Sequence, residues 1–475
     1  MGTFHSDPAL TSRITGGRYC RSVPSLSPRR AGVLADALTI VSIVALGIGV
    51  AAVVNRSPSP PESPESSRFV VAATTEAPAA PADSTYRTPE VTFPTTIPGC
   101  DVVEPPSEGS AIWGQISTSA DAYDNPQYPW YSGPRSVMMT EALQQALPEG
   151  VNVQFGSHRE SLVFQPIPQT SVEPGEPAVP GWASASAEMG RGGTVGLLSV
   201  SVSAGTPVPP CVAGSVQERT TSSDGTVTDV IESWYEYGTD RTNFRSVTAY
   251  APDGSEITAT ASDAEGFRSV NAGKRDTVLT LEELKAIVAL PELRVTASVP
   301  ANTPGPMAGC DEMAYMSDGP PIDADAAQKL NDALADVDID EQFEPGLNTL
   351  RLADFWTGVV CTHVDVVGTG ADISISIMGG QDLPTVPDIY DPAYDNRPLA
   401  TETLDDGAVL QIDEMPYSYS PAPQEGSTGG LRRTVTVTYQ SGTQVEVRSH
   451  AERPDEPLGV NALRAIATAD GLDVL

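Results

Sequence analysis

The side chains best suited to binding chemistry gather in one short segment, residues 121–131. Its aromatic residues are Tyr123, Tyr128, Trp130 and Tyr131, with Asp and Asn residues between them. Aromatic faces stack on sugar rings or peptide groups, while neighbouring polar side chains reach hydroxyl groups. The pattern predicts four ligand-binding aromatics. The alternative is a proline-bearing loop that its own aromatic side chains hold in place.

Paired carboxylates are the second feature with catalytic potential. Glycoside hydrolysis needs two carboxyl groups about 5 to 9 Å apart, and Glu232 with Glu236, or Asp405 with Asp406, are candidates. The usual nucleophile, zinc-binding and phosphate-loop motifs are missing from the sequence. We therefore expect a non-catalytic protein with no cofactor and no metal site. A carboxylate-dependent hydrolase acting on cell-wall polymers is the alternative.

Charge and composition narrow the class of protein. The 475 residues include 27 basic and 62 acidic ones, which gives a formal net charge of −35. A nucleic-acid partner requires a basic surface, so the charge argues against nucleic acid. With 40% hydrophobic residues, the chain can form a core, and this excludes disorder along its whole length.

An apolar segment near the N-terminus predicts a membrane helix over residues 31–54. It contains 18 consecutive uncharged residues, 37–54, and about 20 apolar residues suffice to cross a bilayer. Five arginines precede it and only Asp7 opposes them, so residues 1–30 are expected to form a short disordered tail in the cytoplasm. The segment would act as a single-pass signal anchor in the lipid bilayer. A cleaved signal peptide is the alternative.

A proline-rich stretch follows, and residues 55–98 are predicted to form a disordered stalk. The 42 residues from Ser57 to Pro98 include nine Pro, six Ser and seven Thr. Such a composition buries too little apolar surface to fold, and proline favours the extended polyproline II conformation. The stalk would hold the remaining, extracytoplasmic residues away from the membrane.

The rest of the chain reads as two copies of one unit, residues 99–298 and 299–475. Both open with the triplet Gly-Cys-Asp, at residues 99–101 and 309–311. An internal repeat of this length predicts that the two units share one fold.

The closing part of each unit carries the clearest structural signal. Two alternating runs surround Asp253-Gly254 in the first unit and Ser441-Gly442 in the second, which is typical of a β-hairpin. Apolar residues then recur at helical spacing in residues 279–293 and 458–472. Together with an early helix in each unit, these patterns predict an α+β fold. Its two duplicated units would each have an antiparallel sheet, an early helix and a C-terminal helix.

Four cysteines lie beyond the stalk, namely Cys100, Cys211, Cys310 and Cys361. An even number in an exported segment favours disulfides, and four cysteines allow three pairings. The duplication favours Cys100–Cys211 and Cys310–Cys361, because this choice places one bridge in each unit.

With 24 Arg, 3 Lys and abundant Ala, Pro and Thr, the chain resembles exported, signal-anchored membrane proteins of high-GC actinobacteria whose activity is uncharacterised. The anchor, the stalk and the hairpin-plus-helix ends, residues 246–293 and 434–472, carry this resemblance. It implies an envelope location and no particular activity. We expect tandem units that bind or sense a ligand outside the cell, with a cell-wall polymer or an envelope protein as the partner.

Overall fold

A computed structural model describes most of the chain between Tyr86 and Val474. The described residues are 86–106, 118–119, 123–167, 169–170, 181–238, 240–264, 276–307, 309, 319–354, 356–384, 400–417 and 429–474. No helix within these ranges is both long and apolar enough to cross a membrane. The predicted membrane helix, residues 31–54, lies outside them, as does most of the predicted stalk.

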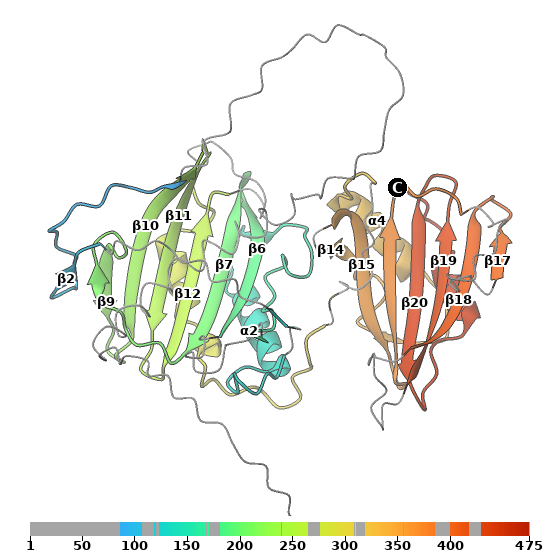
Figure 1. The fold of residues 1–475 in the computed structure, drawn as a ribbon, viewed down its shortest axis with the longest axis horizontal. Helices are drawn as coiled ribbons and strands as arrows, with labels where there is room; N and C mark the ends of the chain where they lie inside the picture. The colour runs from blue at the N-terminus through green and yellow to red at the C-terminus, as the bar shows by residue number, and fades with distance from the viewer. Residues whose placement is uncertain are drawn as a thin grey trace, which may run out of the picture.

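The first unit is built on an antiparallel sheet with the strand order β1-β10-β11-β12-β7-β6-β4 (Figure 1). Strand β9 also pairs with β10, at the end of β10 away from β1. Its strands are β1 (Tyr86–Arg87), β4 (Asn152–Val153), β6 (Trp182–Arg191), β7 (Thr194–Ala204), β9 (Glu218–Thr221), β10 (Val227–Tyr237), β11 (Asp240–Tyr250) and β12 (Ser255–Ser262). Its helices are α2 (Gly133–Gln145), α3 (Leu281–Val288) and the 3-10 turn η1 (Pro291–Leu293). Two short strands, β3 (Thr118–Ser119) and β5 (Gln169–Thr170), pair with each other.

The second unit has an antiparallel sheet in the order β13-β15-β16-β20-β19-β18-β17, with β14 also on β15. Its strands are β13 (Phe343–Glu344), β14 (Arg351–Ala353), β15 (Trp356–Val366), β16 (Ala371–Met378), β17 (Ala400–Thr403), β18 (Val409–Tyr417), β19 (Gly430–Thr438) and β20 (Gln444–Glu452). Helix α4 (Ala324–Ala335) precedes this sheet in the chain, and α5 (Val460–Ala467) follows it.

The two sheets share one strand order. In both, a short strand (β4 or β13) pairs with the first strand of a long hairpin (β6–β7 or β15–β16). The second strand of that hairpin pairs with the last strand of the unit (β12 or β20). This last strand also ends the three-stranded meander that precedes the closing helix. Strands β6, β7, β10, β11 and β12 thus correspond to β15, β16, β18, β19 and β20. The predicted α+β class is confirmed in this form, and the two sheet units suggest an internal repeat.

Both hairpins predicted from the glycine dipeptides are present, as β11–β12 and β19–β20. Gly254 has a φ of 85° and Gly442 one of 94°, a region that glycine enters without the steric cost of a side chain. Asp253 Oδ1 and Ser441 Oγ each accept a hydrogen bond from the backbone N–H two residues further on. The same kind of turn therefore closes both units.

The closing helices cover the apolar face of each sheet. Helix α3 packs on β11 and β12, and α5 packs on β19 and β20. The residues predicted to form the inner stripe are buried, with Leu284 and Ile287 in the first unit and Leu463 and Ile466 in the second. Helix α3 begins with a capping box in which the Thr280 side chain and Glu283 satisfy each other's backbone N–H groups.

An arginine ties the meander to the closing helix at the same place in both units. Arg245 of β11 contacts Glu232 of β10 at 2.7 Å, and Arg433 of β19 contacts Glu414 of β18 at 2.5 Å. Each arginine also donates to the backbone carbonyl two residues before its closing helix. Side-chain contacts therefore repeat along with the strand order.

Residues 97–104 and 211–217 form a small substructure, the N-terminal clamp. Strands β2 (Val103–Glu104) and β8 (Cys211–Val212) pair in parallel, and the Cys100–Cys211 disulfide joins them. This bridge confirms one of the two predicted pairs. Cys361 is disulfide-bonded as well, but Cys310 lies outside the described residues, so the second pair stays a prediction.

The clamp is attached to the edge of the first sheet. The backbone N–H of Arg219 in β9 donates to the carbonyl of Pro98 at 2.9 Å. The Arg219 guanidinium donates to both carboxylate oxygens of Asp229 in β10, at 2.6 Å each. Strand β1, which lies within the predicted stalk, pairs with β10 through Tyr237 and Glu236. Residues 86–104 are therefore held against the first sheet.

Candidate functional site

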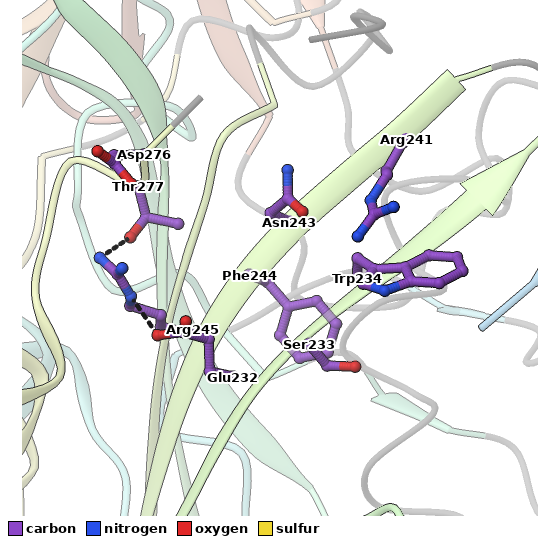
Figure 2. Close-up of a pocket in the computed structure, with 9 residues that line it drawn as sticks. All are labelled: Glu232, Ser233, Trp234, Arg241, Asn243, Phe244, Arg245, Asp276 and Thr277. Carbon is purple, nitrogen blue, oxygen red and sulfur yellow. Dashed lines mark hydrogen bonds and ion pairs between the residues drawn. The ribbon is translucent and has the colours of Figure 1, made fainter. Parts of the chain in front are cut away.

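The candidate site is an open cavity of about 420 Å³ where β10 and β11 extend beyond the helices that cover the sheet, here called the hairpin cavity (Figure 2). Its lining comprises Glu232, Ser233, Trp234, Arg241, Asn243, Phe244, Arg245, Asp276 and Thr277. Seven of these nine residues come from two adjacent strands, so one hairpin builds most of the site.

Strand alternation explains why these residues lie here. Val230 faces Val247 in the core, and every second residue of β10 points to the same side of the sheet. Two and four residues beyond Val230, the same face presents Glu232 opposite Arg245, then Trp234 opposite Asn243. Along this face of β10 and β11, the side chains therefore change from apolar core residues to polar and aromatic residues.

Several contacts fix the walls of the cavity. Arg245 bonds to Glu232 and donates to the Thr277 hydroxyl at 2.8 Å. The Arg241 guanidinium lies 4.0 Å from the centre of the Trp234 ring, a cation–π contact that Figure 2 shows from the side. The Nε of Arg241 is buried without a hydrogen-bond partner among the described residues. The cavity therefore contains a fixed aromatic face and an incompletely satisfied guanidinium.

The amide of Asn243 is held by a buried carboxylate. Its Nδ2 donates to Asp263 Oδ2 at 2.6 Å, and its backbone N–H donates to Asp263 Oδ1 at 2.8 Å. Asp263 itself is buried. Because Asp263 holds both the backbone and the side chain of Asn243, the amide keeps its orientation before any ligand arrives. This lowers the entropy cost of binding.

Aromatic rings continue across the opposite face of the same strands. Tyr86 stacks on Tyr235 with ring centres 6.0 Å apart, and Tyr235 lies 6.4 Å from Phe244. Tyr86 is 53% exposed and Tyr237, next to it on the sheet, is 44% exposed. Exposed neighbouring rings form a flat surface of the kind that binds sugar rings or extended peptides.

The two glutamates of the hairpin are each paired with an arginine. Glu232 and Glu236 lie on one face of β10, four residues apart, so that their Cα atoms are about 13 Å apart. Glu232 is bonded to Arg245, and Glu236 lies 3.9 Å from Arg241. Within the described part of the chain, no cluster of His, Cys, Asp and Glu has the arrangement of a metal site.

The aromatic residues that the sequence marked as ligand-binding lie in or against the first core. Tyr128 and Tyr131 are buried, and Tyr123 and Trp130 are partly buried beside them. The Tyr123 hydroxyl donates to the carbonyl of Phe164 at 3.1 Å, and Tyr131 donates to a neighbouring carbonyl at 2.8 Å. These contacts support the structural alternative for the segment. Ligand binding by its four aromatics stays a prediction.

Alkaline titration should report the burial of this segment. Burial raises the pKa of Tyr123 to about 12 and that of Tyr131 further. Because the fold favours the neutral phenols, this stabilisation is fully present below the pKa of unfolded tyrosine, about 10. It is lost as the pH rises from there toward 12. We expect absorbance titration of tyrosinate to show late-ionising groups in the folded chain, and Tyr123→Phe to remove one. Identical titration curves in native buffer and in urea would contradict this.

The outer face of the second sheet carries His363 and His450, the two histidines of that unit. His363 Nδ1 and Ser374 Oγ are 2.9 Å apart on neighbouring strands. Asp372, two residues before Ser374 on the same strand, bonds to Nδ1 of His450 at 2.9 Å. A triad requires one histidine to contact both the serine and the acid, so this pair of contacts does not build one. Asp405 and Asp406 lie in an exposed turn, where Asp406 Oδ1 accepts from a backbone N–H.

Comparison with known proteins adds little to this geometry. No family model and no curated protein matches the sequence. Two solved structures are weakly similar: a di-domain aromatase/cyclase, StfQ, from the steffimycin biosynthetic pathway, and a putative oleoyl thioesterase from Lactobacillus plantarum. Each is 10% identical, with TM-scores of 0.13 and 0.11 over 72% and 69% of this chain and 86% and 85% of the other. At these scores neither match indicates a shared fold or activity.

Proposed function

We propose that the chain is a membrane-anchored, extracytoplasmic envelope protein that binds a cell-wall polymer without catalysis, and that the hairpin cavity is the place of contact. The apolar segment 31–54 would anchor it, and the stalk and N-terminal clamp would present the two units outside the membrane. The strand order shared by the two sheets is consistent with units duplicated within one exported chain.

The observation that carries the proposal is the concentration of aromatic side chains at one accessible end of the first sheet. Trp234 and Phe244 line the hairpin cavity, and Tyr235 and Tyr86 continue the aromatic surface from Phe244. Arg241 and Asn243 supply hydrogen-bond donors and acceptors beside these rings. Rings for stacking next to polar groups for hydroxyls and amides are what a polysaccharide or its peptide cross-links would require.

Two features favour binding over hydrolysis. The cavity is open, and Glu232, the one glutamate that lines it, is bonded to Arg245. Its other carboxylate, Asp276, comes from the segment before α3. Because Glu232 is bonded to Arg245, the two carboxylates are not both free to act as an acid–base pair.

Replacing Trp234 by alanine tests the proposal. The full chain in detergent micelles would be mixed with purified peptidoglycan and sedimented, and the bound fraction measured over a range of polymer concentrations. Loss of one stacking ring removes about 1–2 kcal/mol of binding free energy, and loss of the Arg241 support adds to it. We expect Trp234→Ala to weaken binding about tenfold or more.

Phe93→Ala is the control, because Phe93 is an exposed aromatic residue that does not line the cavity. It should bind as the unaltered chain does. Equal binding by Trp234→Ala and the unaltered chain would overturn the assignment of the cavity. Release of soluble sugar fragments by the unaltered chain would favour the hydrolase instead.

A further inference from the structure

The two units contact each other through residues 155–161 of the first and the strand β14 of the second. Ser157 and Leu352 form a parallel β-bridge. Arg159 contacts Asp354 at 2.6 Å, and the Asp354 side chain is only 4% exposed. Phe155 of the first unit packs against the apolar core of the second. In Figure 1 these segments connect the facing sides of the two sheets, at β6 and β14. The units therefore form a docked pair.

A cavity of about 610 Å³, the inter-unit cavity, opens at this contact. The first unit contributes Gln144, Leu147, Asn152, Val153, Gln154, Phe155 and Ser161, and the second contributes Ala324 and Arg351. Three of these side chains are amides, four are apolar, one is a hydroxyl and one is a cation. No carboxylate of the described residues lines the cavity, although acidic residues outnumber basic ones more than twofold in the whole chain.

Arg351 is the residue that gives the cavity its chemistry. Its Nη1 donates to Ser161 Oγ across the contact at 2.9 Å. It makes no ion pair within the described part of the chain, whereas Arg159 beside it is paired with Asp354. Arg351 stays accessible to solvent, as a ligand contact must, yet enough protein surrounds it that burial lowers its pKa. An incoming anion would supply the counter-charge that no described residue gives to Arg351.

The other lining residues of the inter-unit cavity indicate which groups the ligand carries besides its anionic group. The amides of Gln144, Asn152 and Gln154 can both donate and accept hydrogen bonds, so they match an amide group. Leu147, Val153 and Phe155 offer a short apolar surface beside them. A ligand with a carboxylate, a neighbouring amide and a small apolar group would satisfy all three.

We propose that the inter-unit cavity binds a small carboxylate ligand that also carries an amide, with Arg351 contacting the carboxylate. A peptide end and an N-acetylated acidic sugar share this chemistry. Because both units line the cavity, the ligand bridges them, and its binding stabilises the docked pair by mass action. The inference is independent of the hairpin cavity, which lies at the opposite side of the first sheet, on β10 and β11.

Calorimetric titration of the full chain in detergent micelles tests the proposal with three probes. N-acetylalanine represents a peptide end, N-acetylmuramic acid represents an acidic sugar, and N-acetylalaninamide is the neutral match of the first. We expect at least one carboxylate probe to bind and the neutral amide to bind at least tenfold more weakly. Raising the salt concentration should weaken the binding of the carboxylate probes but not that of the neutral probe.

Variants then assign the effect to the cavity. Arg351→Gln should weaken carboxylate binding tenfold or more. Arg464→Gln removes a cation of α5 that is paired with Glu402, and it should leave the binding unchanged. Gln154→Glu keeps Arg351 but adds a protein carboxylate that repels the ligand's own, so it should also weaken binding at least tenfold. This second variant keeps the test valid if Arg351→Gln unfolds. Absence of binding by both carboxylate probes, or equal binding of the neutral probe, would overturn the proposal.

Discussion

Arg219→Ala is expected to lower the free energy of unfolding of the first unit by about 3–5 kcal/mol. The guanidinium of Arg219 meets both oxygens of Asp229 at 2.6 Å, and the two side chains are 13% and 9% exposed. Truncating the arginine leaves the Asp229 carboxylate buried without its counter-charge. That desolvation cost, more than the lost attraction, sets the size of the effect. Urea denaturation of the full chain measures it.

A pair of similar geometry on the surface provides the control. Arg464 and Glu402 are also joined by two hydrogen bonds, at 2.7 and 3.0 Å, but their side chains are 39% and 49% exposed. Arg464→Ala should cost far less than Arg219→Ala, because water screens and replaces the contact. Equal losses for the two variants would show that burial of Asp229 contributes nothing to the difference. The double variant Arg219→Leu with Asp229→Leu should recover much of the stability.

Removing the Cys100–Cys211 disulfide is the second change with a large expected effect. The bridge joins residues 111 positions apart, and closing a loop of that length restricts the unfolded chain by about 4–5 kcal/mol in the chain-entropy treatment. We expect Cys100→Ser combined with Cys211→Ser to lower the free energy of unfolding of the first unit by a similar amount. Urea denaturation again provides the measurement.

Reduction of the unaltered chain serves as a comparison for this variant. Added thiol should lower the stability of the first unit in the unaltered chain and leave that of the double serine variant unchanged. Proteolysis should also cut residues 97–104 faster in the variant, because the N-terminal clamp would then be held only by β2–β8 pairing and the contact of Pro98 with Arg219. A loss of stability below about 1 kcal/mol would contradict the expected effect of the bridge.

Local patterns in the sequence predicted the elements whose causes are local. A glycine in the left-handed region closes a hairpin whatever surrounds it, so Gly254 and Gly442 indicated their turns correctly. The stripe containing Leu284 and Ile287 similarly marked a helix with one buried face. Comparison of the two copies, rather than any local pattern, selected Cys100–Cys211 among three possible pairings.

The candidate sites depend on register and docking, which local patterns do not encode. Aromatic residues near Asp and Asn fit a core loop as well as a binding surface, and only contacts such as that of Tyr123 with Phe164, 41 positions away, distinguish the two. The aromatic residues of β10 and β11 gave an available but unused signal, since Trp234 and Tyr235 face opposite sides of one strand. Arg351 meets Ser161 across 190 positions, beyond any sequence pattern.

The covalent link in the N-terminal clamp also determines how the molecule transmits mechanical force. A pull on the chain from its N-terminal side first loads the pairing of β1 with β10. Once that pairing opens, the pull reaches Cys100 and passes through the sulfur atoms directly to Cys211. Residues 101–210, which include α2, β6 and β7, are therefore bypassed by the load. Tension continues instead into β9 and the β10–β12 meander. Three of the eight strands of the first sheet, β4, β6 and β7, and the surface that docks the second unit would thus stay off the covalent path of the load while a tethered molecule is stretched.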